Sequence, residues 1–430
     1  MLSHQKAILL FGDSIALVLS FCAMAIIRFD VGAQGSLIVQ QVGFFALIFA
    51  IWLIVLFIFD LYNLRRVNPN PRNIGLLITA MLINVLLGVV LFYLVPNIGI
   101  SPKTNLVILA VCAFIFLTLW RRLFYLLFTR QFVRRIVIIG NHPLIKHLTA
   151  ELASHPHFGT VATLWETVPD DDTDIEADLI IAHNVAPETL LRLSRHFGTH
   201  TLSLTEAYET IFAKIPVELM TDEKAIHYMA DRSTRAQAVV YRVLEIFIAS
   251  LVLIISSPFL LIAIIARLIE DGSPIFICQT RVGKDGTLFG LYKLRSMKVM
   301  NTDGSAEVSG AAWANKTDTR ITRVGHILRK THIDEVPQMI NIIKGDLALI
   351  GPRAQRPEFV SILERDVPYY YLRHTIRPGF TGWAQIKFRY ARSVDDEREK
   401  FEYDLYYLKN SSPLLDIGII LKTVQIIFTH

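Results

Sequence analysis

The chain has 430 residues, of which 53% are hydrophobic and 19% are charged, and its formal net charge is +5. Its mean hydropathy of +0.43 is too apolar for an ordinary soluble protein. The composition excludes a disordered chain and a nucleic-acid-binding tail, while the positive charge suits a membrane surface or phosphate ligands. The three cysteines, Cys22, Cys112 and Cys278, are too few and too scattered for a disulfide framework or a zinc site.

Four apolar runs at about residues 7–27, 37–59, 75–95 and 104–128 predict four transmembrane helices, because each run can cross a hydrocarbon core of about 30 Å. Lysines and arginines concentrate between the second and third runs and after the fourth, which places these flanks and the rest of the chain in the cytoplasm. A cleaved signal peptide is not expected, since the first run is long and further spans follow it. Asp13, near the start of the first run, is expected to reach interfacial water, with a proton-relay role as the alternative.

A fifth apolar run, residues 247–266, has basic residues on both flanks and Ser257-Pro258 near its middle. Proline removes a helix hydrogen bond and bends the helix. The pattern is consistent with a re-entrant membrane helix at about residues 240–267 that returns to the same face, with serine hydroxyls available to the freed carbonyls. A straight fifth span with a tolerated proline is an equal alternative, and it would place the following residues outside.

The middle segment alternates short buried-strand patterns at residues 136–140, 160–164 and 178–182 with helical stretches. This alternation predicts a small Rossmann-like module with a parallel sheet. The first strand-to-helix turn keeps Gly140 but lacks the second and third glycines of a dinucleotide site, which favours a structural or regulatory role over nucleotide binding. The acidic cluster at 170–174 is interpreted as a solvated loop rather than a metal site.

Residues 279–286 predict a strand and a tight turn, with Arg281 on that strand, and a return strand follows. Lys293 and Arg295 lie two residues apart on the return strand and therefore share one face. Two adjacent cations suit an anionic ligand, and a solvated strand face is the alternative.

Asp334 and Glu335 form the strongest local feature of the sequence. The apolar spacing that follows predicts a helix starting near residue 333, with Pro337 among its first positions, where no amide partner is needed. Carboxylates and phosphate oxygens both bind favourably at such a helix start. Because cations that include Arg329 and Arg353 flank the pair, one carboxylate can bind a divalent metal and the other can attack phosphorus. Simple helix capping is the alternative.

Two later turns, Gly351-Pro352-Arg353 and Arg377-Pro378-Gly379, each place an arginine beside a glycine and a proline. Arginine binds phosphate in a bidentate manner, and glycine allows close approach of the backbone. The final helix from Pro413 has only a narrow polar stripe, so we expect it to lie against membrane or against the re-entrant helix.

In this order, these motifs resemble the bacterial sugar transferase family, the monotopic phosphoglycosyl transferases. The four-helix start with an α/β module resembles the long form of that family, the exopolysaccharide polyprenyl glycosylphosphotransferases. The resemblance covers about the last 190 residues and rests on Ser257-Pro258, the run from Gln279 to Met297, Asp334-Glu335, Lys344-Gly345-Asp346, Gly351-Pro352-Arg353 and Arg377-Pro378-Gly379. The chain departs from the family pattern at Ala354, where a proline commonly stands, and at His332.

The resemblance implies that Asp334 attacks the sugar-bearing phosphorus of a UDP-sugar, that UMP leaves, and that the phospho-sugar passes to the phosphate of an undecaprenyl-type lipid. It implies Mg²⁺ as the cofactor, with Glu335 as its ligand. The implied location is a bacterial inner membrane with the catalytic domain facing the cytoplasm, and the implied partners are membrane lipid, polysaccharide assembly proteins and a second copy in a homodimer. The phosphate-binding residues would be Arg281, Lys293, Arg295, Arg329, Arg353 and Arg377.

The predicted fold class is thus membrane α/β, divided into a four-helix transmembrane domain (1–130), a Rossmann-like module (131–230) and an α+β catalytic domain with amphipathic interfacial helices (231–430). A membrane-anchored nucleotide-sugar dehydratase or epimerase is one alternative, but the sequence lacks its Gly-x-Gly-x-x-Gly and Tyr-x-x-x-Lys patterns. A non-catalytic scaffold of a polysaccharide assembly is the other, and it predicts that Asp334 is dispensable.

Overall fold

A computed structural model describes ten stretches of the chain: residues 2–28, 35–67, 70–94, 102–128, 135–155, 158–168, 177–229, 235–298, 320–388 and 393–428. The chain divides into two compact units, Met1–Ile211 and Phe212–His430. We call them the N-terminal unit and the C-terminal unit. The predicted division into three domains stays a prediction.

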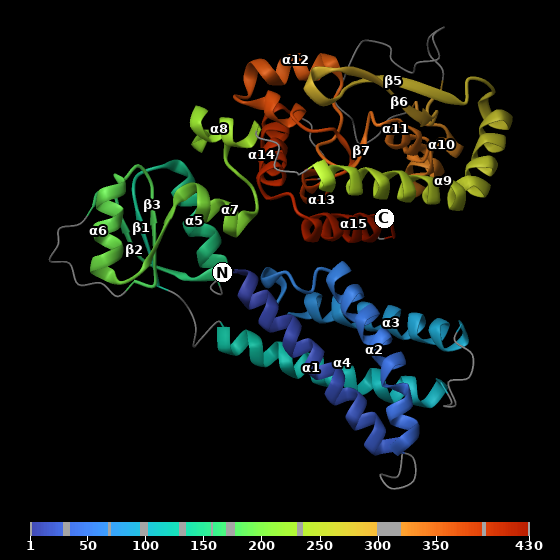
Figure 1. The fold of residues 1–430 in the computed structure, drawn as a ribbon, viewed down its shortest axis with the longest axis horizontal. Helices are drawn as coiled ribbons and strands as arrows, with labels where there is room; N and C mark the ends of the chain where they lie inside the picture. Colours follow the sequence, from blue (N-terminus) through green and yellow to red (C-terminus); the bar gives the residue numbers. More distant parts are fainter. Residues whose placement is uncertain are drawn as a thin grey trace. The chain divides into compact units, whose positions relative to one another are not determined.

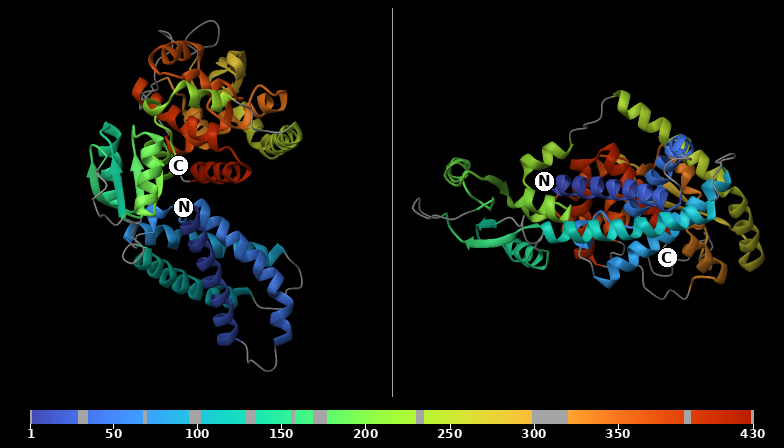
Figure 2. Two further views of the ribbon diagram at one scale, coloured as in Figure 1. Left: turned by 60° about the vertical axis from the view of Figure 1, so that its left-hand side comes forward. Right: turned by 90° about the horizontal axis from the view of Figure 1, so that it is seen from below.

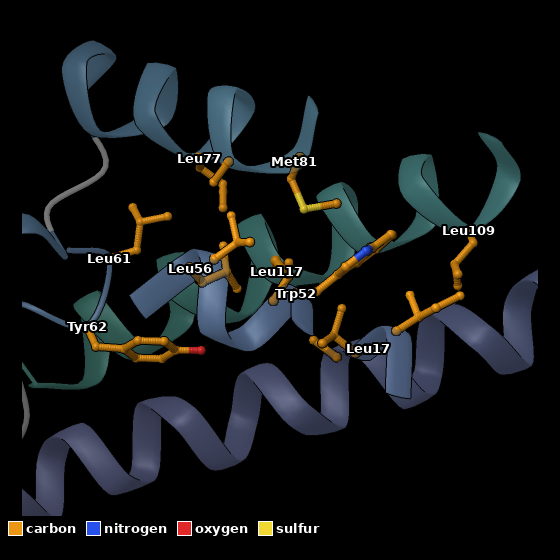
Figure 3. Packing of buried hydrophobic residues seen from close by; sticks show 14 of the residues in the cluster. Leu17, Trp52, Leu56, Leu61, Tyr62, Leu77, Met81, Leu109 and Leu117 are labelled. Carbon is orange, nitrogen blue, oxygen red and sulfur yellow. The ribbon is translucent and has the colours of Figure 1, made fainter. Parts of the chain in front are cut away.

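The four predicted N-terminal helices are present. α1 packs against α4, and α3 contacts both α2 and α4 (Figure 2). Their inner faces meet in a core to which Leu17, Trp52 and Leu117 contribute (Figure 3). The helices are α1 (Leu2–Arg28), α2 (Gly35–Ile58), α3 (Pro71–Leu94) and α4 (Pro102–Leu126), with the 3-10 turn η1 (Leu64–Arg66) after α2.

The outer face of this helical group is apolar, with Phe11, Leu82 and Val107 among its exposed side chains. Within the described stretches, α1, α3 and α4 are long and apolar enough to cross a membrane, whereas the apolar stretch found in α2, Val42–Ile58, is shorter. An outer surface of this kind matches lipid rather than water.

The expectation for Asp13 is wrong. Its side chain is fully buried, and its Oδ2 forms an ion pair with Arg121 Nη2 at 2.5 Å. Arg121 also donates to the carbonyl oxygen of Leu61 at 2.8 Å. The sequence did not reveal this partner, because Arg121 lies on α4, far from Asp13 in the chain. The pair joins α1, α4 and the loop after α2.

The middle segment forms a four-stranded sheet with the order β2-β1-β3-β4, and its strand pairs are parallel. Figure 1 shows the strands between α5 and α6, which is the predicted Rossmann-like arrangement. The strand β4 was not predicted, because it has only four residues and most of them are polar. The elements are β1 (Arg135–Ile139), α5 (Pro143–Ser154), β2 (Thr160–Trp165), β3 (Leu179–Ala182), α6 (Pro187–Phe197), β4 (His200–Ser203) and α7 (Leu204–Phe212).

The C-terminal unit combines helices with two small sheets. The predicted hairpin is present as the antiparallel pair β5 and β6, and β7 pairs with β8 in parallel. The elements are η4 (Val217–Leu219), α8 (Asp222–Met229), α9 (Arg235–Asp271), β5 (Phe276–Val282), η5 (Lys284–Gly286), β6 (Leu288–Leu294), α10 (Arg323–Thr331), η6 (Ile333–Glu335), α11 (Gln338–Lys344), β7 (Ala348–Ile350), α12 (Pro357–Asp366), η7 (Tyr370–His374), β8 (Gly379–Thr381), α13 (Trp383–Lys387), α14 (Val394–Asn410) and α15 (Pro413–Phe428).

The fifth apolar run lies in α9, a helix of 37 residues with Pro258 inside it. Figure 1 shows that α9 changes direction part way along its length. Pro258 cannot donate a hydrogen bond to the carbonyl oxygen of Ile254. Ser257 Oγ donates to that oxygen at 2.8 Å instead, as the sequence predicted for the serine hydroxyls.

Both ends of α9 contact other elements of the C-terminal unit. Near its start, Arg242 donates to the carbonyl oxygens of Ile342 at 2.6 Å and Ile343 at 2.7 Å, where α11 ends. Near its end, the buried Arg267 donates to Thr322 Oγ1 at 2.8 Å, just before α10. One compact unit therefore holds the helix on both sides of its proline.

Close backbone packing of β7 on β8 predicts that Gly379→Ala lowers the melting temperature of the full chain. A Cβ at position 379 would lie 2.0 Å from the amide nitrogen of Gly351, and backbone cannot move aside. Overpacking of this kind costs about 1 to 3 kcal/mol, so Tm in lipid nanodiscs should fall by about 5 °C. Gly75→Ala is the control, because its Cβ would meet open space. An equal change of Tm in both variants would contradict this account.

Candidate active site

Asp334 and Glu335 lie on the 3-10 turn η6, between the end of α10 and the start of α11. The predicted helix start near 333 is therefore wrong for the α-helix, which begins at Gln338. Pro337 supplies no amide for an α-helical bond, and the amide of Val336 bonds three residues back to Ile333 at 3.2 Å. The acidic pair thus occupies a tight turn between two helices.

Glu335 is held by two of the predicted phosphate-binding residues. Its Oε1 accepts a hydrogen bond from Lys293 Nζ at 2.7 Å and lies 3.5 Å from Arg353 Nη2. Burial alone would raise the pKa of Glu335, but Lys293 and then Arg353 hold that pKa well below its usual range. Glu335 is therefore a permanent anion in this site.

Asp334 has a different environment from its neighbour. It is 7% exposed, and its Oδ1 is buried with no hydrogen-bond partner in the described parts of the chain. Burial raises the pKa of Asp334 to about 6, while Lys293 and Arg329 oppose that rise and Glu335 adds to it. At neutral pH, Asp334 is therefore an ionised carboxylate with one uncommitted oxygen.

The resemblance implies that Asp334 attacks the substrate, and the raised pKa of its carboxyl group then predicts a pH dependence for that step. Only the ionised carboxylate is a nucleophile. The rate of UMP release from a UDP-sugar, measured in a single turnover without lipid acceptor, should therefore rise about tenfold per pH unit below pH 6 and level off above it. A rate that stays constant from pH 4.5 to pH 8 would contradict the assignment of Asp334 as the attacking group.

A small pocket is linked to the acidic pair through Arg353, which also pairs with Glu335. The pocket is lined by Arg281, Leu291, Gln338, Leu347, Arg353, Ala354, Gly379 and Phe380. Arg281 donates to the carbonyl oxygen of Ala354 at 3.1 Å, and its buried Nε has no partner in the described chain. Burial, followed by the guanidinium groups of Arg353 and Arg356, lowers the pKa of Arg281. Clustered guanidinium groups repel one another unless an anion lies between them, so this pocket suits phosphate groups.

The structure brings Arg281, Lys293, Arg329 and Arg353 to the acidic pair or its pocket. Arg329 donates to Ser296 Oγ at 2.8 Å and lowers the pKa of Asp334 through its charge. The sequence pattern gave no role to Gln338 or Arg356. Each follows a predicted motif by a few residues, but neither stands in a glycine turn or an acidic pair.

Two other predicted phosphate-binding residues, Arg295 and Arg377, contact α9 or its C-terminus instead of the acidic pair. Arg295 is buried and donates to the carbonyl oxygens of Asp271 at 2.9 Å and Gly272 at 2.7 Å, which caps the C-terminus of α9. β6 ends at Leu294, so Arg295 leaves the strand face that it was expected to share with Lys293. Arg377 donates to Glu245 Oε2 on α9 at 2.8 Å. Their predicted roles in phosphate binding stay predictions.

The acidic pair fits magnesium only together with a substrate. Within the described stretches, no three His, Cys, Asp or Glu residues are grouped as metal ligands. Magnesium commonly takes one or two carboxylates and completes its shell with water and substrate phosphates. Glu335, whose Oε1 already accepts from Lys293 at 2.7 Å, supplies one such carboxylate, and the rest of the shell would come from water and the substrate phosphates.

In the described residues of the Rossmann-like module, no group of metal-ligating side chains comparable to the acidic pair is found. Gly140 has a φ of 127°, and a Cβ there would lie 2.9 Å from the carbonyl oxygen of His183. The missing side chain therefore serves the packing of β1 beside the end of β3 rather than a ligand. The acidic cluster at 170–174 lies outside the described residues.

Comparison with known proteins matches the part of the chain that carries the acidic pair. Residues 236–430 match the family described as bacterial sugar transferase. The chain is 42% identical over 192 residues to the UDP-N-acetylgalactosamine-undecaprenyl-phosphate N-acetylgalactosaminephosphotransferase of Aeromonas hydrophila, covering 45% of this chain and 44% of that protein. It is 38% identical over 193 residues to the exopolysaccharide production protein PSS of Rhizobium leguminosarum bv. phaseoli, covering 43% of this chain and 94% of that protein.

A third relative is the UDP-glucose:undecaprenyl-phosphate glucose-1-phosphate transferase of Escherichia coli (strain K12), with 37% identity over 182 residues, 42% of this chain and 38% of that protein. The chain thus spans less than half the length of the Aeromonas and Escherichia relatives, but nearly all of the Rhizobium protein. The matched stretch contains the acidic pair, its cations and α9 from residue 236. The chain therefore belongs to the bacterial sugar transferase family, and its C-terminal unit carries the transferase domain of that family.

Proposed function

We propose that this protein transfers a sugar-1-phosphate from a UDP-sugar to a polyprenyl phosphate of the undecaprenyl type and so starts a polysaccharide or glycoconjugate repeat unit. Support comes from the names of the relatives, which pair undecaprenyl phosphate with UDP-N-acetylgalactosamine or UDP-glucose. The observation that carries the proposal is the uncommitted, buried Asp334 Oδ1 beside an anion neutralised by Lys293 and Arg353.

In the first half-reaction, the Asp334 carboxylate bonds through one of its oxygens to the sugar-bearing phosphorus of the UDP-sugar. The bond from that phosphorus to the bridging oxygen breaks, and the bridging oxygen leaves on UMP. Arg281 and Arg353 face the pocket and reduce the repulsion between the carboxylate and the anionic diphosphate. The product is a phospho-sugar carried on Asp334.

In the second half-reaction, a phosphate oxygen of the polyprenyl phosphate bonds to the same phosphorus, and the Asp334 carboxylate leaves. The acceptor phosphate lies at lipid headgroup depth, so the site must lie at the membrane surface. A re-entrant α9 would hold the site at that depth. A straight helix of 37 residues would be about 55 Å long and would carry its ends to opposite faces, whereas Arg242 and Arg267 both bind the C-terminal unit.

Magnesium would be held by Glu335 together with the substrate phosphates, and when bound it would neutralise charge on the transferred phosphate. Lys293 orients Glu335 through its hydrogen bond of 2.7 Å.

The proposed location is a bacterial inner membrane, with the C-terminal unit facing the cytoplasm. A cysteine replacing the exposed Lys284 should then react with an impermeant maleimide only after the membrane is opened.

The proposed reaction is tested by screening UDP-sugars against the full chain in lipid nanodiscs. UDP-N-acetylgalactosamine, UDP-glucose and UDP-galactose would be mixed with undecaprenyl phosphate and Mg²⁺, and UMP would be measured. At least one donor should release UMP in proportion to the lipid-linked product. No UMP from any UDP-sugar, or consumption of the donor with NAD chemistry, would overturn the proposal.

A further inference from the structure

The segment Phe212–Met229 lies before the matched family region but packs inside the C-terminal unit. Its apolar side chains, Ile215, Val217, Met220, Ala225 and Tyr228, are buried in one cluster with residues of α12, η7 and α14. These partners include Leu363, Tyr370 and Phe401. We call residues 212–229 the support segment.

Polar contacts fix the support segment to α14. The amide of Ile215 donates to the carbonyl oxygen of Glu402 at 3.0 Å, and the amide of Val217 donates to Glu402 Oε1 at 3.3 Å. Lys214 Nζ lies 3.0 Å from Glu402 Oε2 and 3.1 Å from Glu399 Oε1. The side chains of Lys214 and Glu402 are almost fully enclosed, so the pair that they form is not a surface pair. The segment is therefore part of the domain rather than a linker.

A first route leads from the support segment to the pocket through Trp383. Trp383 Nε1 donates to the carbonyl oxygen of Ala213 at 2.9 Å. Trp383 directly follows Gly382, where a Cβ would lie 2.1 Å from the carbonyl oxygen of Gly351. Gly351 begins the turn that carries Arg353. The position of Trp383 therefore affects the backbone of the turn that carries Arg353.

A second route leads through Tyr370 and Arg373. Tyr370 packs in the same cluster as Ile215 and Val217, and its hydroxyl accepts a hydrogen bond from Arg373 Nη1. Arg373 Nη2 donates to the carbonyl oxygen of Arg353 at 3.0 Å. Both routes therefore converge on one residue, Arg353, whose side chain faces Glu335 and the pocket.

We propose that the support segment, although it does not line the phosphate pocket, holds Arg353 in place there, and that Trp383 and Tyr370 are the positioning residues that act through Arg353. This inference rests on the proposed function, in which Arg353 binds the diphosphate of the donor. The residues that join the pocket to the Rossmann-like module along the chain would then also set the affinity for the nucleotide.

The test is a double-mutant cycle on the affinity for UDP, measured by calorimetry with the full chain in nanodiscs. Trp383→Phe keeps an aromatic ring but removes the donor to Ala213. It should weaken UDP binding about tenfold when Arg353 is present, and less than about twofold in an Arg353→Met background, because coupled residues are not additive. Arg398→Met removes an exposed contact between the same segment and α14, and it should leave the affinity unchanged.

Tyr370→Phe repeats the cycle through the second route and should give the same dependence on Arg353 if Trp383→Phe fails to fold. Equal weakening with and without Arg353 would overturn the inference, since a merely structural role acts independently of that side chain. No weakening by either variant would also overturn it. A wild-type chain that neither binds UDP nor releases UMP would instead contradict the proposed function.

Discussion

Asp334→Asn is expected to reduce UMP release by at least about 10³-fold while the chain stays folded. Removing a nucleophile costs several powers of ten in rate, and an amide oxygen cannot form the proposed bond to phosphorus. The rate is measured as UMP released by the full chain with the preferred UDP-sugar. Asp285→Asn is the control, because Asp285 is an exposed acidic residue on the turn η5. A variant that retains more than a tenth of the wild-type rate would contradict the proposed role.

The same substitution should stabilise the protein at alkaline pH. A pKa raised from 3.8 to about 6 means that the ionised Asp334 costs the folded state about 3 kcal/mol. This cost is absent below about pH 4 and complete above about pH 6, and asparagine avoids it. The Tm of Asp334→Asn should therefore exceed that of the wild type at pH 8 and approach it at pH 4. A lower Tm at pH 8 would show that the loss of activity comes from misfolding.

Arg373→Met is expected to cause the largest loss of stability. Arg373 and Asp404 are each 2% exposed, and Arg373 Nη2 lies 3.1 Å from Asp404 Oδ2. Removing the cation leaves the buried Asp404 with only the charge of Lys400 to offset its own, and breaking a buried pair in this way costs about 3 to 5 kcal/mol. The carbonyl oxygen of Arg353 and the hydroxyl of Tyr370 also lose their donor.

This loss should appear as a fall in Tm of about 10 °C at pH 8. Burial raises the pKa of Asp404 to about 6, although Arg373 lowers it. Without Arg373, Asp404 should take up a proton more readily, so the difference from the wild type should shrink at pH 5. Arg365→Met is the control, since its pair with Asp366 is exposed. A fall in Tm that is equal in both variants, or equal at both pH values, would contradict this argument.

The sequence predicted the architecture because its signals are local. Apolar length identified α1 to α4, and alternation of strands and helices identified β1, β2 and β3. The hairpin of β5 and β6 followed from a glycine turn between two strand patterns. Short elements without a strong hydrophobic period were not predicted, and β4 is one of them. The support segment was not predicted either, because its burial depends on residues about 150 positions later in the chain.

The sequence predicted which residues form the site, but it predicted only part of their arrangement in space. Asp334, Glu335, Lys293 and Arg353 come together as expected. The residues Arg295 and Arg377 have the same local sequence signals, but they bind the ends of α9 through Asp271, Gly272 and Glu245. Spacing along the chain cannot distinguish an arginine that caps a helix from one that faces a pocket, because the partner is remote in sequence.

The path of the fifth apolar run could not be decided from hydropathy and proline alone. Length and composition allow α9 to cross, and they also allow it to bend. The contacts of Arg242 and Arg267 are tertiary hydrogen bonds with one unit, and they support the proposed re-entrant form. Neither has a signature in the local sequence.

The most direct test of the proposed chemistry is capture of the phospho-sugar on Asp334. The full chain would be mixed with a donor and Mg²⁺ in the absence of lipid acceptor, quenched, digested and analysed by mass spectrometry. The account predicts a peptide heavier by one sugar phosphate on Asp334, formed together with UMP and lost when polyprenyl phosphate is added. Lipid-linked product formed in steady turnover with no such adduct, and with UMP released only when the acceptor is present, would contradict it.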